Sequence, residues 1–134
     1  HTLEMLAINA TDVGDAFLVN LGHHPGLQDL GLRGTKVTAE GTKALANFPK
    51  LRKIRLYDNP IDDSAVKHIA ANCPDVTLLG LCMTQISDQS LAHLATMSKL
   101  ESVDISGNKP ITKEAVLKLE VTLTNCRVEW YGDR

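Results

Sequence analysis

The stretch from Leu27 to Val37, which reads LQDLGLRGTKV, decides the fold of this chain. Apolar residues stand at its first, fourth and sixth positions, and Thr35 follows three positions later. Alternating apolar positions are typical of a short strand with one buried face. Thr35 stands where the chain leaves this strand, and its hydroxyl can bond backbone groups of a buried turn that otherwise lack partners.

The same pattern recurs along the whole chain. Its starts are Leu3, Leu27, Leu51, Val76, Leu100 and Val128, so the period is 24 or 25 residues until a last interval of 28. The small polar residue recurs as Thr11, Thr35, Asn59, Thr84 and Asn108. A fixed period places each strand parallel to the next. The pattern therefore predicts a stack of repeats with a polar ladder running along it.

The second half of each unit is predicted to be a helix. Helix-start signals recur at Gly14, Thr38, Asp62, Ser87 and Thr112, and the last four are good capping residues. Acids that suit the helix dipole follow as Asp15, Glu40, Asp63, Asp88 and Glu114. Gly41 weakens the second of these helices.

On these motifs, from Leu3 to about Tyr131, the chain resembles the leucine-rich-repeat family. It is most similar to the helix-bearing, ribonuclease-inhibitor-like type with a Thr/Asn ladder. The closing segment from Asn125 to Trp130 is similar to that of planctomycete-type bacterial repeat proteins. The resemblance implies an α/β fold: a right-handed β-α solenoid of about five repeats plus a C-terminal capping strand, forming one domain over residues 1–134. It also implies a concave parallel sheet that binds proteins and does not catalyse.

Composition excludes several classes of function. The net charge is -2 over 134 residues, which does not favour a nucleic-acid partner. No apolar run is long enough to insert into a membrane. Three cysteines do not make a disulfide framework, and they leave the compartment open. His68 and His93 share a helix position, but a metal site needs three or four converging ligands, so we expect no metal, cofactor or enzymatic activity.

Strand residues between the buried ones are predicted to line the concave face in three lanes. The last places in the lanes fall on Trp130, Gly132 and Arg134. The candidate site for an unidentified protein partner is a basic and aromatic patch with apolar neighbours: Arg33, Lys53, Arg55, Tyr57, Leu78, Cys82 and Asp104. The alternative is that Asp29 merely pairs with Lys53 and Arg33 stacks on Tyr57, as ordinary surface contacts. Cys82 is expected to be an exposed thiol.

The two ends of the stack are predicted to differ. A helix over residues 112–124 and the strand with Trp130 and Tyr131 can close the C-terminal end. No cap precedes the first repeat, which leaves its apolar side chains at an open end: Leu3, Leu6, Ile8, Val13 and Phe17. This favours a second function, that of a structural or accessory subunit docking through the uncapped N-terminal repeat, either by self-association or against a neighbouring domain. A frayed first repeat or a trimmed chain stays open as an explanation.

Overall fold

A computed structural model of the chain describes residues 3–9 and 12–131. Six short strands form one sheet in which every neighbouring pair is parallel and the spatial order follows the sequence. The strands are β1 (Met5–Ala7), β2 (Asp29–Gly31), β3 (Lys53–Arg55), β4 (Leu78–Gly80), β5 (Ser102–Asp104) and β6 (Arg127–Glu129).

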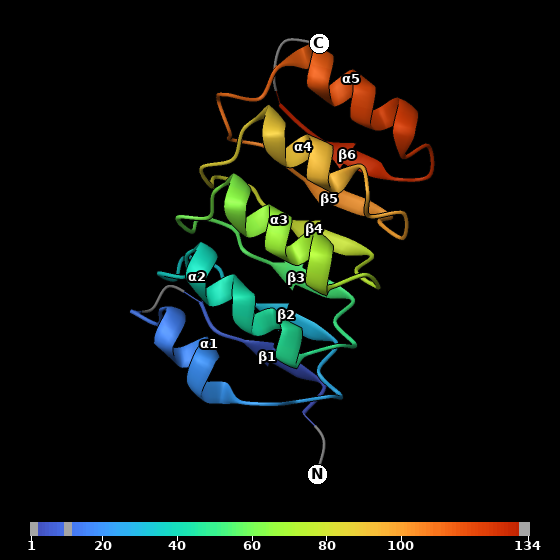
Figure 1. Ribbon diagram of the computed structural model, residues 1–134. Helices are drawn as coiled ribbons and strands as arrows, with labels where there is room; N and C mark the ends of the chain where they lie inside the picture. Colours follow the sequence, from blue (N-terminus) through green and yellow to red (C-terminus); the bar gives the residue numbers. More distant parts are fainter. Residues whose placement is uncertain (1–2, 10–11, 132–134) are drawn as a thin grey trace.

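Helices cover one face of this sheet and leave the other uncovered (Figure 1). They are α1 (Asp15–Leu21), α2 (Ala39–Thr42), α3 (Asp63–Asn72), α4 (Asp88–Leu94) and α5 (Lys113–Thr122). Helix α2 has only four residues and continues as a 3-10 helix, Lys43–Asn47. We call the uncovered side the open face. The arrangement is the β-α solenoid that the repeat predicts.

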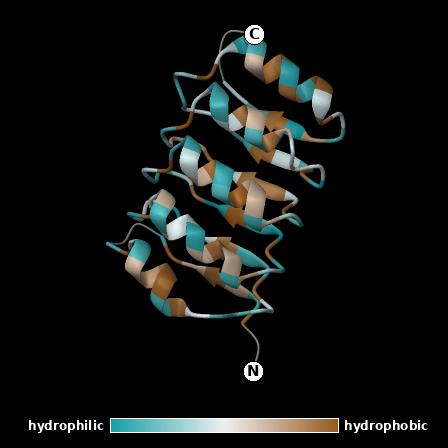
Figure 2. Cartoon of the chain, in the orientation of Figure 1, coloured by the Kyte–Doolittle hydropathy of each residue, from teal (hydrophilic) through white to brown (hydrophobic). Residues whose placement is uncertain are grey.

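The core lies between the sheet and the helices. The central residue of each inner strand faces it, and Leu30, Ile54 and Val103 are fully buried. Apolar residues therefore gather along the inside of the stack in Figure 2. Because every repeat places the same positions here, one continuous core runs through all units.

The predicted register of the last repeat is wrong by three residues. Val128 pairs with Val103, so it matches the fourth position of the motif rather than the first. The first position falls on Asn125, which is exposed. Because a polar residue occupies that position, the apolar pattern could be aligned only by moving on to Val128. Trp130 consequently lies one residue beyond the paired strand, level with Ile105, and packs against the core.

Among the described residues, the polar ladder contains two inter-repeat pairs. Asn59 accepts a hydrogen bond from Thr35 at 2.6 Å and donates to the carbonyl of Leu32. Asn108 likewise accepts from Thr84 at 3.1 Å and donates to the carbonyl of Leu81 at 2.9 Å. Each asparagine thus satisfies backbone groups of the preceding unit as well as its own. Thr11 lies outside the described residues.

A second set of polar contacts joins the helices. All five predicted residues precede a helix, and the side chains of four of them accept a capping hydrogen bond, whereas Gly14 has no side chain to do so. In addition, an aspartate at the first helical position accepts from the capping residue of the next repeat. Asp15 bonds Thr38, Asp63 bonds Ser87 and Ser90, and Asp88 bonds Thr112. We call these contacts first-turn carboxylate bonds.

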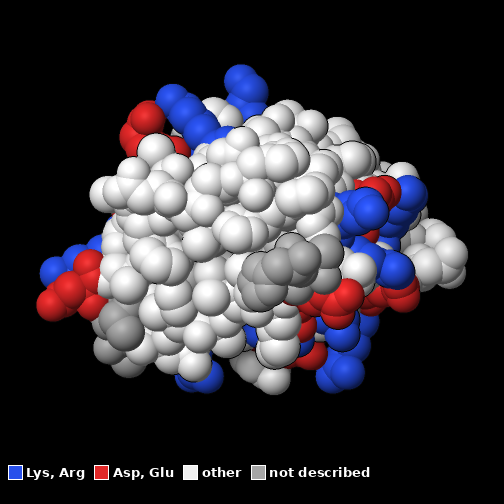
Figure 3. Space-filling view, turned by 90° about the horizontal axis from the view of Figure 1, so that it is seen from below, with Lys and Arg blue, Asp and Glu red and all other residues white. Residues whose placement is uncertain are grey.

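The expected difference between the ends is only partial. Helix α5 and the core-packed Trp130 cover the last strand, but Leu117 and Val121 on α5 are 46% and 76% exposed and Tyr131 is 84% exposed. At the other end Leu3, Leu6 and Phe17 are only partly buried. Figure 3 views that end directly and shows a broad uncharged area with charged groups around its rim.

Candidate functional site

The open face carries the side chains that the lanes predict on the described residues of β1 to β5. Asp29, Lys53, Leu78 and Ser102 are neighbours in one row, and Gly31, Arg55, Gly80 and Asp104 in the next. The sixth strand departs from the prediction, because Arg127 and Glu129 take the places assigned to Trp130 and Gly132. Gly132 and Arg134 lie outside the described residues.

Tyr57 lies across the neighbouring strand and fills the space above Gly80. A Cβ atom on Gly80 would stand 2.4 Å from two carbons of the Tyr57 ring, so no larger residue fits there without moving the ring. The guanidinium of Arg33 lies 5.9 Å from the ring centroid, a cation–π distance. The predicted stacking of Arg33 on Tyr57 is therefore present. The small residue Gly80 serves this contact and does not leave room for a partner.

The ring of Tyr57 forms part of a hollow of about 200 Å³ on this face. Four predicted residues line it, namely Arg33, Tyr57, Cys82 and Asp104, together with Asp58 and Met83. The sequence analysis missed these last two residues. Both have positive φ, 57° and 55°, at a repeat position that is glycine in two other units, Gly34 and Gly107. That shared position was the signal that could have found them.

The hollow has a negative electrostatic character. Burial raises the pKa of Tyr57, and the carboxylates of Asp104 and Glu129 raise it further against the opposing effect of Arg55. Burial also raises the pKa of the Cys82 thiol, with Asp104 and Asp58 adding to the shift and Arg33 opposing it. A raised pKa keeps Cys82 as a neutral thiol near pH 7, which argues against a reactive thiolate.

Arg33 lines this hollow, whereas the other two cations of the predicted patch, Lys53 and Arg55, lie on β3 outside its lining. Arg55 donates to Asp29 at 2.8 Å, so Asp29 pairs with Arg55 and not with Lys53. Lys53 is exposed and makes no ion pair with another described residue. It lines a second hollow, of about 470 Å³, together with Met5, Asp29 and Arg52. Leu78, half-buried on β4, is the neighbour of Lys53 in the sheet. The predicted patch is thus divided into a basic part and an acidic hollow.

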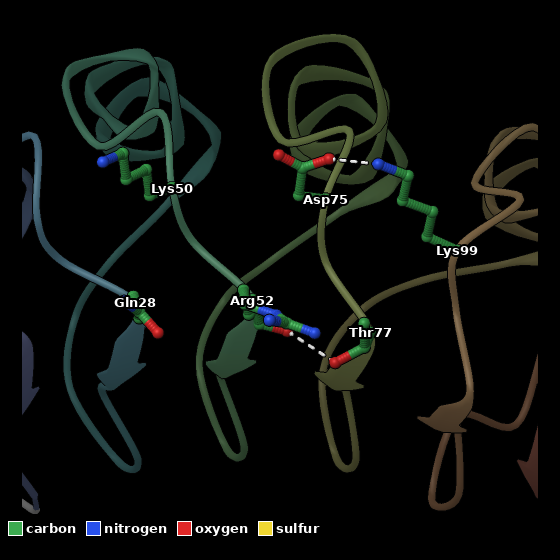
Figure 4. Close-up of a pocket in the computed structure, with 6 residues that line it drawn as sticks. All are labelled: Gln28, Lys50, Arg52, Asp75, Thr77 and Lys99. Carbon is green, nitrogen blue, oxygen red and sulfur yellow. Dashed lines mark hydrogen bonds and ion pairs between the residues drawn. The ribbon is translucent and has the colours of Figure 1, made fainter.

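A third hollow, of about 390 Å³, runs along the edge where the helices return to the strands (Figure 4). Lys50, Arg52 and Lys99 line it. Lys99 bonds Asp75 at 2.6 Å and lowers the pKa of that carboxyl. Such exposed pairs contribute little to stability. The sequence analysis did not single out this edge.

Other kinds of site find little support in the described part of the chain. No group of three or more His, Cys, Asp and Glu residues there could hold a metal ion. The three cysteines are free, and burial raises the pKa of Cys73 to about 12. None of the described helices is long and apolar enough to cross a membrane.

Comparison with known proteins agrees with this geometry. The family model described as Leucine Rich repeat matches residues 96–119. The parallel sheet, the helix-covered face and this match show an α/β solenoid of the leucine-rich-repeat kind.

Among solved structures, an internalin (inlF) from Listeria monocytogenes is similar, with a TM-score of 0.52 and 15% identity. The alignment covers 96% of this chain and 48% of the internalin chain, so the chain spans about half of its length. At this identity the likeness shows the fold alone. No curated protein matches.

Proposed function

We propose that this leucine-rich-repeat protein is a non-catalytic protein-binding module that uses the open face of its sheet. Its helix-bearing units and Thr/Asn ladder support the ribonuclease-inhibitor-like subtype. The observation that carries the proposal is the hollow lined by Arg33, Tyr57 and Met83 on the face that the described helices leave uncovered. Tyrosine, arginine and methionine are enriched at protein interfaces.

Rigidity supports the same function. The ring of Tyr57 is held between Gly80 and Arg33, so it loses little further freedom when a partner packs on it. Solenoids commonly present such extended strand-lined surfaces to protein partners. Lys53 adds an exposed cation close by, which can steer an acidic group of the partner toward this face.

Affinity capture with matched baits tests this proposal. Proteins retained by the wild-type chain should be lost from a Lys53→Glu/Tyr57→Ala bait. They should persist on a Lys67→Glu bait, which makes the same charge change on the helix side. Circular dichroism of each bait confirms that it is folded. Retention of the same proteins by the open-face variant contradicts this function.

The open N-terminal end supports a second candidate, a structural or accessory subunit that docks there. Met5 and Val19 are 60% and 59% exposed, and the end is largely uncharged (Figure 3). Large exposed apolar areas are typical of interaction surfaces. Under this function, bound partners should crosslink to the region from Met5 to Leu21 and dissociate from a Val19→Glu variant. Crosslinks confined to Tyr57 and Lys53 would instead support the open face.

A further inference from the structure

The hollow beside Tyr57 has the chemistry to recognise one particular kind of side chain. It is lined by an aromatic ring, Tyr57, and a thioether, Met83, with the neutral thiol of Cys82 also contributing. These groups suit the methylenes of a long side chain.

The charged side chains that line this hollow carry more negative than positive charge. Two carboxylates, Asp58 and Asp104, line the hollow, against the single guanidinium of Arg33, which already lies over the Tyr57 ring. Asp104 also accepts the backbone N–H of Ser106 at 2.9 Å. The exposed carboxylate of Asp58 makes no side-chain hydrogen bond or ion pair with another described residue. One further positive charge would therefore be favourable here.

We propose that this hollow receives an arginine side chain of a protein partner. The methylenes of that arginine lie against Tyr57 and Met83, and its guanidinium reaches Asp58 and Asp104. Arginine fits better than lysine, because a planar guanidinium can donate two parallel hydrogen bonds to one carboxylate and can also stack on an aromatic ring. This inference rests on the proposed binding function and names the chemical class that the open face selects.

The basic side of the same face sets the polarity of the partner. Lys53 and the Arg55–Asp29 pair lie on β2 and β3, whereas Asp104 lies on β5, two strands from β3. Two strand spacings are roughly 10 Å. A partner segment crossing the sheet thus carries its arginine over β4 and β5 and presents neutral or acidic groups to β3.

The test uses N-acetylarginine methylamide as the probe and its citrulline counterpart as a neutral probe of nearly the same shape. In a nitrogen-15 NMR titration, the arginine probe should shift the backbone amides of Asp58, Cys82, Met83 and Asp104. Binding of a single residue should be weak, with a Kd of roughly millimolar order. The citrulline probe should bind at least about tenfold more weakly, because it lacks the charge.

The variant Asp58→Asn/Asp104→Asn removes both charges with little strain. Asparagine tolerates the positive φ at position 58 and can still accept the Ser106 N–H at position 104. This variant should weaken the arginine probe at least about tenfold. The control Glu101→Gln should not, since Glu101 is exposed and its side chain makes no hydrogen bond with another described residue. Equal binding of the two probes, or unchanged binding to the double variant, overturns the inference.

Failure of this inference can be told apart from failure of the binding function. If the double variant still captures the partners that Lys53→Glu/Tyr57→Ala loses, the open face binds proteins but does not select arginine. If both variants capture the same proteins as the wild type, the open face is not the binding surface at all.

Discussion

One residue after each of the strands β2 to β5 adopts a backbone conformation that residues with a side chain usually avoid. Gly34 and Gly107 have φ of 66° and 73°, and Asp58 and Met83 occupy the same repeat position with φ of 57° and 55°. The turn after each of these four strands has this conformation, which directs the chain from the strand into the Thr/Asn ladder. For an L residue with a side chain it costs roughly 1–2 kcal/mol.

Met83→Gly should therefore stabilise the protein. Relief of the backbone strain exceeds the entropy that glycine adds to the unfolded chain, so we expect a gain of about 0.5–1 kcal/mol in the free energy of unfolding. Urea denaturation measures this gain. The reverse control, Gly107→Ala, should lose stability, because its Cβ would stand 2.8 Å from a carbon of Met83. A less stable Met83→Gly protein contradicts the argument.

Asp63 should make stability depend on pH. Burial by itself raises the pKa of Asp63, but hydrogen bonds from Ser87 and Ser90 outweigh that effect and hold the pKa below its ordinary value. The carboxylate therefore stabilises the fold above the unfolded pKa of about 3.9, and this stabilisation is lost as pH falls through the folded pKa.

Asp63→Asn should cost about 1–2 kcal/mol at pH 7, where charged hydrogen bonds are lost. The difference from the wild type should shrink in acid, as pH falls through the folded pKa of Asp63 and its carboxyl becomes neutral like the amide. Urea denaturation at pH 7 and at about pH 2 compares the two proteins, with Glu101→Gln as the control carboxylate. A deficit of the same size at both pH values would show that the charge of Asp63 is not responsible.

Between neighbouring helices, the first-turn carboxylate bond joins three of the four pairs of described helices. The bond is present from α1 to α2, from α3 to α4 and from α4 to α5. Between α2 and α3 the first helical residue is Ala39, and the capping residue opposite is Asp62, which bonds its own helix at Ala65. The bond is missing there because Ala39 has no carboxylate to accept it and Asp62 has no hydroxyl to donate it.

The double variant Ala39→Asp/Asp62→Ser should build the missing bond. A serine side chain at position 62 can still cap α3, while the new aspartate accepts from it as Asp63 does from Ser87. Ala39→Asp alone should destabilise, because it brings two carboxylates together. A double-mutant cycle by urea denaturation should give a favourable coupling of about 1–2 kcal/mol. Additive effects of the two substitutions would mean that the bond does not form.

Over the whole molecule, polar bonds and core burial are distributed unevenly. The fourth repeat, with β4 and α4, and the fifth repeat, with β5 and α5, are joined by two kinds of bond: one from Thr84 to Asn108 and one from Thr112 to Asp88. In the first repeat, which contains β1 and α1, Leu18 is the one described apolar residue that is fully buried. Leu6 and Phe17 in the same repeat are only partly buried. A repeat protein unfolds unit by unit according to such local differences.

Hydrogen exchange should therefore be fastest in the first unit. Helices α1 and α4 have seven residues each and provide a matched comparison within one molecule. Amides of α1 should exchange earlier than those of α4, because α1 packs on one neighbouring helix and α4 on two. Exchange measured by mass spectrometry checks this order. Equal protection of α1 and α4 in the isolated chain would contradict it.

Much of this molecule follows from the period alone. The 24- or 25-residue repeat predicts the parallel strands, the helix starts, the buried leucines and the Thr/Asn positions, because each depends on residues close together in the chain. The period also predicted that most residues of the candidate patch lie on the open face, since side chains alternate between the two faces along a strand. The register of β6 did not follow, because polar Asn125 interrupts the apolar pattern.

The tertiary structure decided which side chains meet across repeats. It paired Asp29 with Arg55 rather than Lys53, laid Tyr57 over Gly80, and joined Asp63 to Ser87 in the next unit. It also brought Asp58 and Met83 beside Cys82 to form the hollow. These contacts join residues from different repeats, and long side chains can choose among several neighbours. Periodicity determines which row of the sheet a residue occupies, whereas packing determines which neighbouring side chain it contacts.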